Sequence, residues 1–480
     1  MMLTWYGWRC TVGSFKMVRR LWSTFSHLSG NVAVDQKEVD PCCDPSNPRS
    51  LDFAQILAAE QNIRNAVVHT ECRHSRFLSN AAGCDVFLKL ENTQSVFLIP
   101  MYFCLHSLSP PLFGFLKITG SYKERGACNA LLCLSEEERK KGVYVGSTGN
   151  FARAISFHGK ELGLPVTVVL PRYSSLSTIT ACKNCGANVV IEGKNNDDPL
   201  ETAFKLAREC GGKFINSYDH LDVMAGAGTV ALEILQDIKD IDAILVPVGG
   251  GGLLAGITVA VKNISPDTKV IGLESETCPA TQMALRKGQP IVTKTHPSFA
   301  DGLAVKNVKP FLDIVDGVIA VREGNLAIGI LKMFEEEHIV LDGAGAIGPA
   351  ALLSRNIEGL SGKRVVCILS SGNTDSSFIG RTIEKGLAID DRLIQVIVTV
   401  PDMVGGFAEL FEIFGKNGSS VVEFLTDGVF HRFDVCTVEF KIVAEVSGLD
   451  HAIQLNEAIL ARYGPHCRFS LSHRTQRINA

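Results

Sequence analysis

Short β-branched runs alternate with amphipathic segments along most of this chain, from about residue 53 to residue 389. Examples of the apolar runs are 166–170, 188–191, 243–248, 270–273 and 365–369, and the segment 199–210 is typical of the helical parts. Continuous apolar runs separated by helices are characteristic of βαβ units around a buried parallel sheet. We therefore predict an α/β enzyme whose chemistry lies in loops after the carboxyl ends of strands.

The pattern changes after residue 391. Here we predict a strand at 393–400, a helix at 407–414, strands at 420–425 and 434–443, a helix at 451–461 and a weak strand near Cys467. The order βαββαβ is that of a ferredoxin-like unit. Residues 391–480 are thus predicted to form a separate regulatory domain, after a main domain at 51–390.

Charge and cysteine content limit the class of partner and the compartment. The chain has 47 Lys and Arg against 51 Asp and Glu, so no basic surface for nucleic acid is expected. Its 15 cysteines form no regular pattern, which favours a reducing, cytoplasmic compartment over a disulfide scaffold. The leader at 1–50 leaves a mitochondrial location open, because residues 1–34 contain four basic residues and no acidic one.

An uncharged stretch of 25 residues, 92–116, exceeds the roughly 20 residues that cross a bilayer. Pro100, Pro110 and Pro111 interrupt any helix there, so no membrane partner is predicted.

Four consecutive glycines, Gly249, Gly250, Gly251 and Gly252, follow an apolar strand and precede a helix that opens at Leu253. Backbone N–H groups at such a turn can approach an anion closely, and the helix N-terminus favours negative charge. Since no Lys-Ser/Thr pair follows, a nucleotide P-loop is not indicated. The alternatives are a phosphate site, which the strand-to-helix position favours, and a flexible turn.

A second glycine cluster at 343–348 fits G-x-G-x-x-G. A dinucleotide site would also need an acidic residue about 20 positions further on, and the sequence around Ile368 has none. Close packing of a helix is therefore the favoured interpretation.

Lys123 lies in the polar motif 119–127 (TGSYKERGA), in a turn directly before a helical segment. A lysine that forms a Schiff base must lose its proton, and a helix N-terminus together with the nearby Arg125 would lower its pKa. Such a lysine alone is more often a surface residue. Together with a phosphate site it suits pyridoxal phosphate.

Two polar loops follow strands in the same way, 147–150 (STGN) and 370–373 (SSGN). With these loops, and with 87–94 (FLKLENTQ), 225–229 (AGAGT) and 300–305 (ADGLAV), the chain resembles the fold-type-II pyridoxal-phosphate enzymes from about residue 51 to 389. Within that group it resembles the threonine and serine dehydratases, to which serine racemase is closely related. The resemblance implies a tryptophan-synthase-β-like fold of two parallel-sheet subdomains. The C-terminal part resembles an ACT domain, which implies an amino-acid effector and a homo-oligomer.

The resemblance also implies roles for particular residues. Lys123 would be the Schiff-base lysine and the base at the substrate Cα, with Tyr122 beside the cofactor ring. Asn150 would bind the phenolic oxygen, and Ser370 would face the pyridine nitrogen. The phosphate would be held by Gly249, Gly250, Gly251, Gly252 and Leu253, and the substrate carboxylate by Ser147, Thr148, Gly149 and Asn150.

The implied activity is that of an L-threonine and L-serine ammonia-lyase, which gives 2-oxobutanoate or pyruvate and ammonia by β-elimination. The alternatives are a serine racemase or β-replacement synthase of the same fold, and an inactive amino-acid sensor.

Three departures from the family bear on that choice. The chain has 24 residues, 95–118, where the family has about one, and this insertion precedes Lys123 closely enough to displace its turn. Thr148 stands where dehydratases often have Ala and serine racemase has Ser. Glu274 matches one ligand of a divalent-cation site, but Cys278 and Ala280 supply no matching carboxylate, so no metal ligand is assigned.

Overall fold

The computed structural model describes residues 50–98, 115–147, 149–193, 198–288, 291, 293, 296–305, 314–355, 357–428, 436–464 and 467–470. The predicted leader, except for Ser50, and the predicted substrate-binding residue Thr148 lie outside these ranges. No helix within the ranges is both long enough and apolar enough to cross a membrane.

The larger sheet has six strands in the order β1-β2-β12-β9-β10-β11. The strands are β1 (Cys72–His74), β2 (Asp85–Lys89), β9 (Ala243–Pro247), β10 (Lys269–Ser275), β11 (Gly317–Val321) and β12 (Arg364–Ile368). Only β1 pairs antiparallel within this sheet; β12 is central, with Val366 opposite Phe87 of β2 and Ile244 of β9. Every residue of β9 is buried, as expected for a parallel strand covered on both faces.

Helices pack on this sheet because their apolar side chains form common cores with the buried side chains of the strands. One core contains Ile244, Val246 and Val366 with residues of α9 (Leu221–Asp237) and α10 (Gly252–Ile264). A second core joins strand residues to α3 (Arg76–Ala82), α12 (Glu323–Glu336) and α13 (Ile347–Leu353). The remaining elements of this part are α2 (Phe53–Ile63), α11 (Ala280–Lys287) and the 3-10 turns η2 (Glu91–Thr93) and η3 (Asp301–Leu303).

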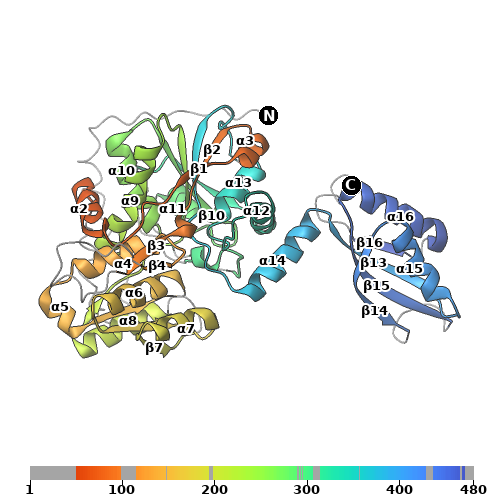
Figure 1. Ribbon diagram of the computed structural model, residues 1–480, viewed down its shortest axis with the longest axis horizontal. Helices are drawn as coiled ribbons and strands as arrows, with labels where there is room; N and C mark the ends of the chain where they lie inside the picture. The colour runs from red at the N-terminus through yellow and green to blue at the C-terminus, as the bar shows by residue number, and fades with distance from the viewer. Residues whose placement is uncertain are drawn as a thin grey trace. The chain divides into compact units, whose positions relative to one another are not determined.

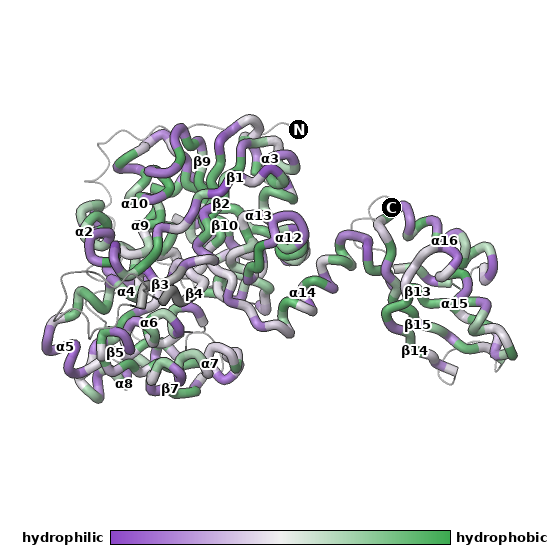
Figure 2. Tube along the Cα trace, viewed as in Figure 1, coloured by the Kyte–Doolittle hydropathy of each residue, from purple (hydrophilic) through white to green (hydrophobic). Residues whose placement is uncertain are grey.

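The smaller sheet is fully parallel, in the order β7-β6-β5-β8. Its strands are β5 (Val143–Gly146), β6 (Val166–Leu170), β7 (Asn188–Ile191) and β8 (Lys213–Phe214), and around it lie α5 (Glu136–Lys141), α6 (Asn150–Glu161), α7 (Leu176–Asn184) and α8 (Asp198–Cys210) (Figure 1). Two parallel sheets confirm the predicted architecture. In Figure 2 helix α5, whose sequence is EEERKK and whose residues include none that is buried, is strongly hydrophilic.

Helix α4 (Lys123–Leu132) connects the two parallel-sheet units, since it packs against α9 of one and α6 of the other. Eight consecutive residues of this helix, Glu124 to Leu131, are buried. The position of Lys123, its first residue, is therefore fixed by both units.

The C-terminal part is an antiparallel sheet in the order β14-β15-β13-β16, with two helices. Its elements are β13 (Leu393–Pro401), α15 (Gly406–Lys416), β14 (Ser420–Asp427), β15 (Thr437–Glu445), α16 (Leu449–Tyr463) and β16 (Cys467–Ser470), and α14 (Ser376–Ile389) precedes them. Alternate residues of β13, among them Val396 and Val398, are fully buried with Leu410, Phe414 and Leu455. The predicted ferredoxin-like order is confirmed.

The predicted insertion begins and ends in two short strands, β3 (Ser95–Leu98) and β4 (Phe115–Ile118). They pair antiparallel, with Ser95 opposite Ile118, so the two ends of the insertion lie side by side. Residues 99–114 are outside the described ranges.

Candidate active site

Lys123 begins helix α4, and its Nζ donates a hydrogen bond of 3.1 Å to the carbonyl of Ser217. Two aromatic rings flank the amine: Nζ lies 5.1 Å from the ring centroid of Tyr122 and 5.9 Å from that of Phe151. The amine is thus held at a helix N-terminus between aromatic faces, a position where a lysine can react with a bound carbonyl group.

The turn before Lys123 pairs with the polar loop 370–373. The N–H of Tyr122 donates to the carbonyl of Ser370 at 3.1 Å, and the N–H of Gly372 donates to that of Gly120 at 3.0 Å. An antiparallel bridge joins Ser121 to Ser371 between these bonds. Two loops about 250 residues apart in sequence therefore form one rigid edge of the site.

A cavity of about 610 Å³ opens at this edge. The predicted site residues that line it are Lys123, Tyr122, Ser147, Gly149, Asn150, Gly249, Gly250, Gly251, Gly252, Leu253 and Ser370. The structure thus brings every predicted site residue within the described ranges to one cavity, while the roles assigned to them remain predictions.

The four glycines form the turn between β9 and α10, at one wall of the cavity. Gly251 has φ +88°, which favours glycine, and a Cβ on Gly250 would overlap the ring of Tyr218. The first N–H groups of a helix have no partner inside the helix, so those of this turn and of Leu253 can bind an anion. A phosphate fits this cradle.

Asn150, the first residue of α6, takes part in a network of side-chain hydrogen bonds across the cavity. Its Nδ2 donates to Ser371 Oγ at 2.8 Å and to Asp342 Oδ2 at 3.3 Å, while its Oδ1 accepts from Asn373 Nδ2 at 3.0 Å. Asn373 Nδ2 also donates to the carbonyl of Thr119 at 2.7 Å. The network therefore connects Asn150 to the turn that carries Lys123.

Asp342, Ser371 and Asn373 of this network were not among the predicted site residues. Asp342 is 8% exposed, and burial raises the pKa of its carboxyl group to about 6, above the usual range. A buried acid in a polar cavity is a frequent feature of active sites. The sequence did contain a signal, since Asp342 directly precedes the glycine cluster 343–348.

That glycine cluster serves close packing, as predicted. A Cβ on Gly343 would overlap the carbonyl of Phe299, and one on Gly348 would overlap the thiol of Cys367. Helix α13 begins within the cluster, at Ile347, and is buried from Ile347 to Leu352.

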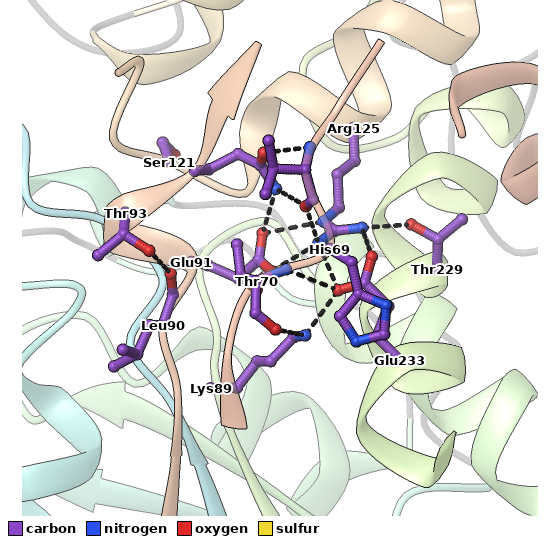
Figure 3. A network of polar contacts seen from close by, with 12 residues as sticks. His69, Thr70, Lys89, Leu90, Glu91, Thr93, Ser121, Arg125, Thr229 and Glu233 are labelled. Atoms are coloured by element: carbon purple, nitrogen blue, oxygen red, sulfur yellow. Dashed lines mark hydrogen bonds and ion pairs between the residues drawn. The ribbon is translucent and has the colours of Figure 1, made fainter. Parts of the chain in front are cut away.

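A buried ionic network surrounds Arg125 of helix α4, two residues after Lys123 (Figure 3). The guanidinium group makes paired hydrogen bonds of 2.6–2.9 Å to both carboxylate oxygens of Glu91 and of Glu233. Lys89 Nζ donates to Glu233 Oε2 at 2.6 Å and to the carbonyl of Thr70, also at 2.6 Å. Two cations thus balance two anions within the group, and α4 is joined to α9 and to the end of β2.

This network corrects the expected role of Arg125. The predicted effect on Lys123 required a free positive charge, but the two carboxylates neutralise the guanidinium and raise its pKa against the opposing effect of burial. Burial likewise disfavours the charged form of Glu91, and Arg125 outweighs that effect and lowers the pKa of Glu91. Residues two apart on a helix do not face each other, and the guanidinium of Arg125 pairs instead with Glu91 and Glu233.

Gln94 holds the base of the insertion. Its carbonyl accepts the N–H groups of Thr119 at 2.9 Å and of Gly120 at 3.0 Å. Its side chain exchanges two hydrogen bonds with the backbone of Val68, at 2.9 and 3.0 Å. The turn 119–122 is therefore bonded on both sides, and the insertion does not displace it.

Glu274 caps helix α11, since its carboxylate accepts the N–H groups of Thr281 at 2.9 Å and of Gln282 at 2.7 Å. Burial outweighs these bonds and raises the pKa of Glu274 to about 7. Among the described residues no group of three His, Cys, Asp or Glu could hold a metal ion.

Comparisons with known proteins agree with this geometry. Residues 114–371 match the family model described as pyridoxal-phosphate dependent enzyme. An L-threonine ammonia-lyase from Thermotoga maritima is 35% identical over 425 residues, which cover 86% of this chain and 98% of that protein. A catabolic L-threonine dehydratase from Escherichia coli is 32% identical, with 70% and 96% covered.

Solved structures show the same likeness. A threonine deaminase from Solanum lycopersicum superposes with a TM-score of 0.59 at 28% identity, over 71% of this chain and 95% of its own. A serine racemase from Dictyostelium discoideum gives a TM-score of 0.58 at 29% identity, over 68% and 99%.

Proposed function

Because this chain belongs to the pyridoxal-phosphate-dependent enzyme family, we propose that it is an ammonia-lyase that acts on L-threonine and L-serine. The observation that carries this proposal is the position of Lys123 in one cavity with a glycine cradle and two polar loops. The products are ammonia with 2-oxobutanoate from threonine, or with pyruvate from serine.

The residues of the cavity fit pyridoxal phosphate. Lys123 supplies the amine, the turn 249–253 supplies N–H groups for the phosphate, and Asn150 supplies an amide for the phenolic oxygen. Tyr122 would lie beside the ring and Ser370 at the pyridine nitrogen. When bound, the cofactor supplies an electron sink for the charge that develops at the substrate Cα.

The chain's own groups bind the substrate and move its protons. Ser147 offers a hydroxyl, and Gly149 and Asn150 offer backbone N–H groups, at the N-terminus of α6, where a carboxylate is favoured. Lys123 Nζ, released to its neutral form, removes the proton from Cα as general base. The protonated Nζ can return that proton to the β-hydroxyl, which then leaves as water, and the unsaturated product takes up water and hydrolyses to ammonia and the 2-oxoacid.

Ser370 bears on which reaction follows proton removal. A neutral hydroxyl at the pyridine nitrogen stabilises negative charge less than a carboxylate would, so loss of the β-hydroxyl is favoured over return of the proton. This chemistry favours the lyase over the racemase. The turn 119–122 is bonded to 370–372 and to Gln94, which favours the lyase over the inactive sensor.

The test is to incubate purified protein loaded with pyridoxal phosphate with L-threonine and to measure 2-oxobutanoate and ammonia. Equimolar release is expected from the natural chain and none above background from Lys123→Ala. Chiral analysis with L-serine distinguishes the racemase, which would give D-serine faster than pyruvate. If protein that has bound the cofactor releases neither a 2-oxoacid nor ammonia, the proposal is overturned.

We further propose that residues 51–390 form the catalytic domain and 391–480 an ACT-like regulatory domain with an amino-acid effector, in a homo-oligomer. The support is the ferredoxin-like topology and the helix that precedes it. Asp375 and Phe378, at the start of α14, line the cavity, and the same helix leads into β13 through Asp391. A change in the C-terminal sheet can thus reach the mouth of the cavity through one helix.

A further inference from the structure

Asp342 is fixed at the buried end of the hydrogen-bond network that includes Asn150. Its backbone N–H donates to the carbonyl of Ser371 at 3.2 Å, and its Oδ1 accepts the N–H of Gly345 at 2.7 Å. The other carboxylate oxygen, Oδ2, accepts a hydrogen bond of 3.3 Å from Asn150 Nδ2.

Asn150 is the residue whose amide would donate to the phenolic oxygen of the cofactor. Its Oδ1 is occupied by Asn373, so only the two N–H groups of Nδ2 can serve that oxygen. In the structure these N–H groups point to Ser371 Oγ and to Asp342 Oδ2. A bound phenolic oxygen must therefore share or replace one of these acceptors.

The charge of Asp342 decides how strongly its carboxyl group competes with the phenolic oxygen for the Asn150 amide. An ionised carboxylate is a strong acceptor for the Asn150 amide and repels a nearby phenolate, whereas a neutral carboxyl is a weak acceptor and carries no charge. Burial favours the neutral form of Asp342 most strongly, and the nearby carboxylate of Asp301 adds to that effect. Hydrogen bonds from Ser371, Gly345 and Asn150 favour the ionised form, but burial outweighs them and raises the pKa to about 6.

We propose that Asp342 is a positioning residue for the cofactor: its neutral carboxyl frees the Asn150 amide for the phenolic oxygen, and its ionisation weakens cofactor binding. This inference rests on the proposed function, because it requires pyridoxal phosphate in the cavity. By linkage, the cofactor in turn favours the protonated form of Asp342.

The test compares dissociation constants for pyridoxal phosphate, without substrate, across about pH 5 to 8, in the natural chain and in Asp342→Asn. Asparagine has nearly the same shape and stays neutral. The titration of the cofactor's own groups affects both proteins, so the ratio of the two constants isolates Asp342. We expect the natural chain to match the variant near pH 5 and to bind about tenfold more weakly near pH 8.

Asp375→Asn is the matched control, since Asp375 is another carboxyl at the cavity but hydrogen-bonds to Ser177 instead. It should keep the pH profile of the natural chain. If Asp342→Asn does not fold, Asp342→Ser is a smaller neutral replacement that permits the same comparison.

A ratio that stays constant over the whole pH range would overturn the role of Asp342 while the cofactor still binds. Failure of the natural chain to bind pyridoxal phosphate at any pH would instead overturn the proposed function.

Discussion

The backbone N–H of Thr119 donates a hydrogen bond of 2.9 Å to the carbonyl of Gln94, although 24 residues separate the two in the chain. Gly120 donates to the same carbonyl, and β3 and β4 continue the pairing outward. The insertion thus starts and finishes at one point beside the turn 119–122.

Removing residues 95–118 and joining Gln94 to Thr119 through one glycine should leave the fold and the site intact. We expect cofactor affinity and kcat/KM to change by less than about threefold, because loop length has only a small effect on the free energy of closure. The measurements are cofactor titration and steady-state kinetics with threonine. Loss of cofactor binding would show that the insertion itself supports the turn.

Thr119→Pro is the matched variant, because it keeps the insertion but removes the N–H that bonds to Gln94. It should weaken cofactor binding more than the deletion does.

Arg125→Lys should destabilise the protein strongly, although it keeps the charge. A lysine cannot make paired hydrogen bonds to both Glu91 and Glu233, and imperfectly paired buried carboxylates cost about 3–5 kcal/mol. Chemical unfolding of the protein measures this cost.

Arg64→Lys is the control, since Arg64 pairs with Glu60 one helical turn away on the surface. It should leave the free energy of unfolding nearly unchanged, because an exposed ion pair contributes little to stability. Equal effects of the two substitutions would contradict the structural role of the buried network.

Gly250→Ala should weaken binding of the cofactor's phosphate, because the added methyl group must displace the ring of Tyr218 or shift the turn. We expect the dissociation constant for pyridoxal phosphate to rise at least about tenfold, a loss of one hydrogen bond's free energy or more. Gly380→Ala in α14 is the control, since a Cβ there meets nothing within 4 Å. An unchanged dissociation constant for pyridoxal phosphate in Gly250→Ala would contradict the phosphate-binding role of the turn 249–253.

Glu274 should make stability depend on pH. The pKa of Glu274 is raised to about 7 in the folded protein. Its contribution to the free energy of unfolding is therefore fully present below the pKa of the unfolded chain and is lost as pH rises through about 7. Glu274→Gln keeps an oxygen acceptor for the N–H groups of α11 and removes the titration. Between about pH 5 and 8 the melting temperature should therefore fall less steeply with pH in the variant than in the natural chain. Identical slopes of melting temperature against pH in the two proteins would contradict the raised pKa of Glu274.

The fold was largely predictable because its strands are long apolar runs and its helices are amphipathic. The C-terminal elements lie within a few residues of their predicted bounds, and the site loops were found since each follows a buried strand. Pairing between distant loops was not predictable. Asn373 and Asp342 reach Asn150 across about 200 residues of sequence, and spacing along the chain contains no information on such contacts.

Arg125 shows a different limit. Its nearness to Lys123 in sequence suggested an electrostatic effect, but helical geometry turns it toward Glu91 and Glu233. Only the folded chain reveals those partners.

Lys123 is the residue to which we expect pyridoxal phosphate to become attached. Borohydride reduction of the cofactor-loaded protein, followed by proteolysis and mass spectrometry, tests it directly. The structure predicts a phosphopyridoxyl group on the peptide that contains Lys123, and its loss when L-threonine is present during reduction. A phosphopyridoxyl group on another lysine, with Lys123 unmodified, would contradict the account.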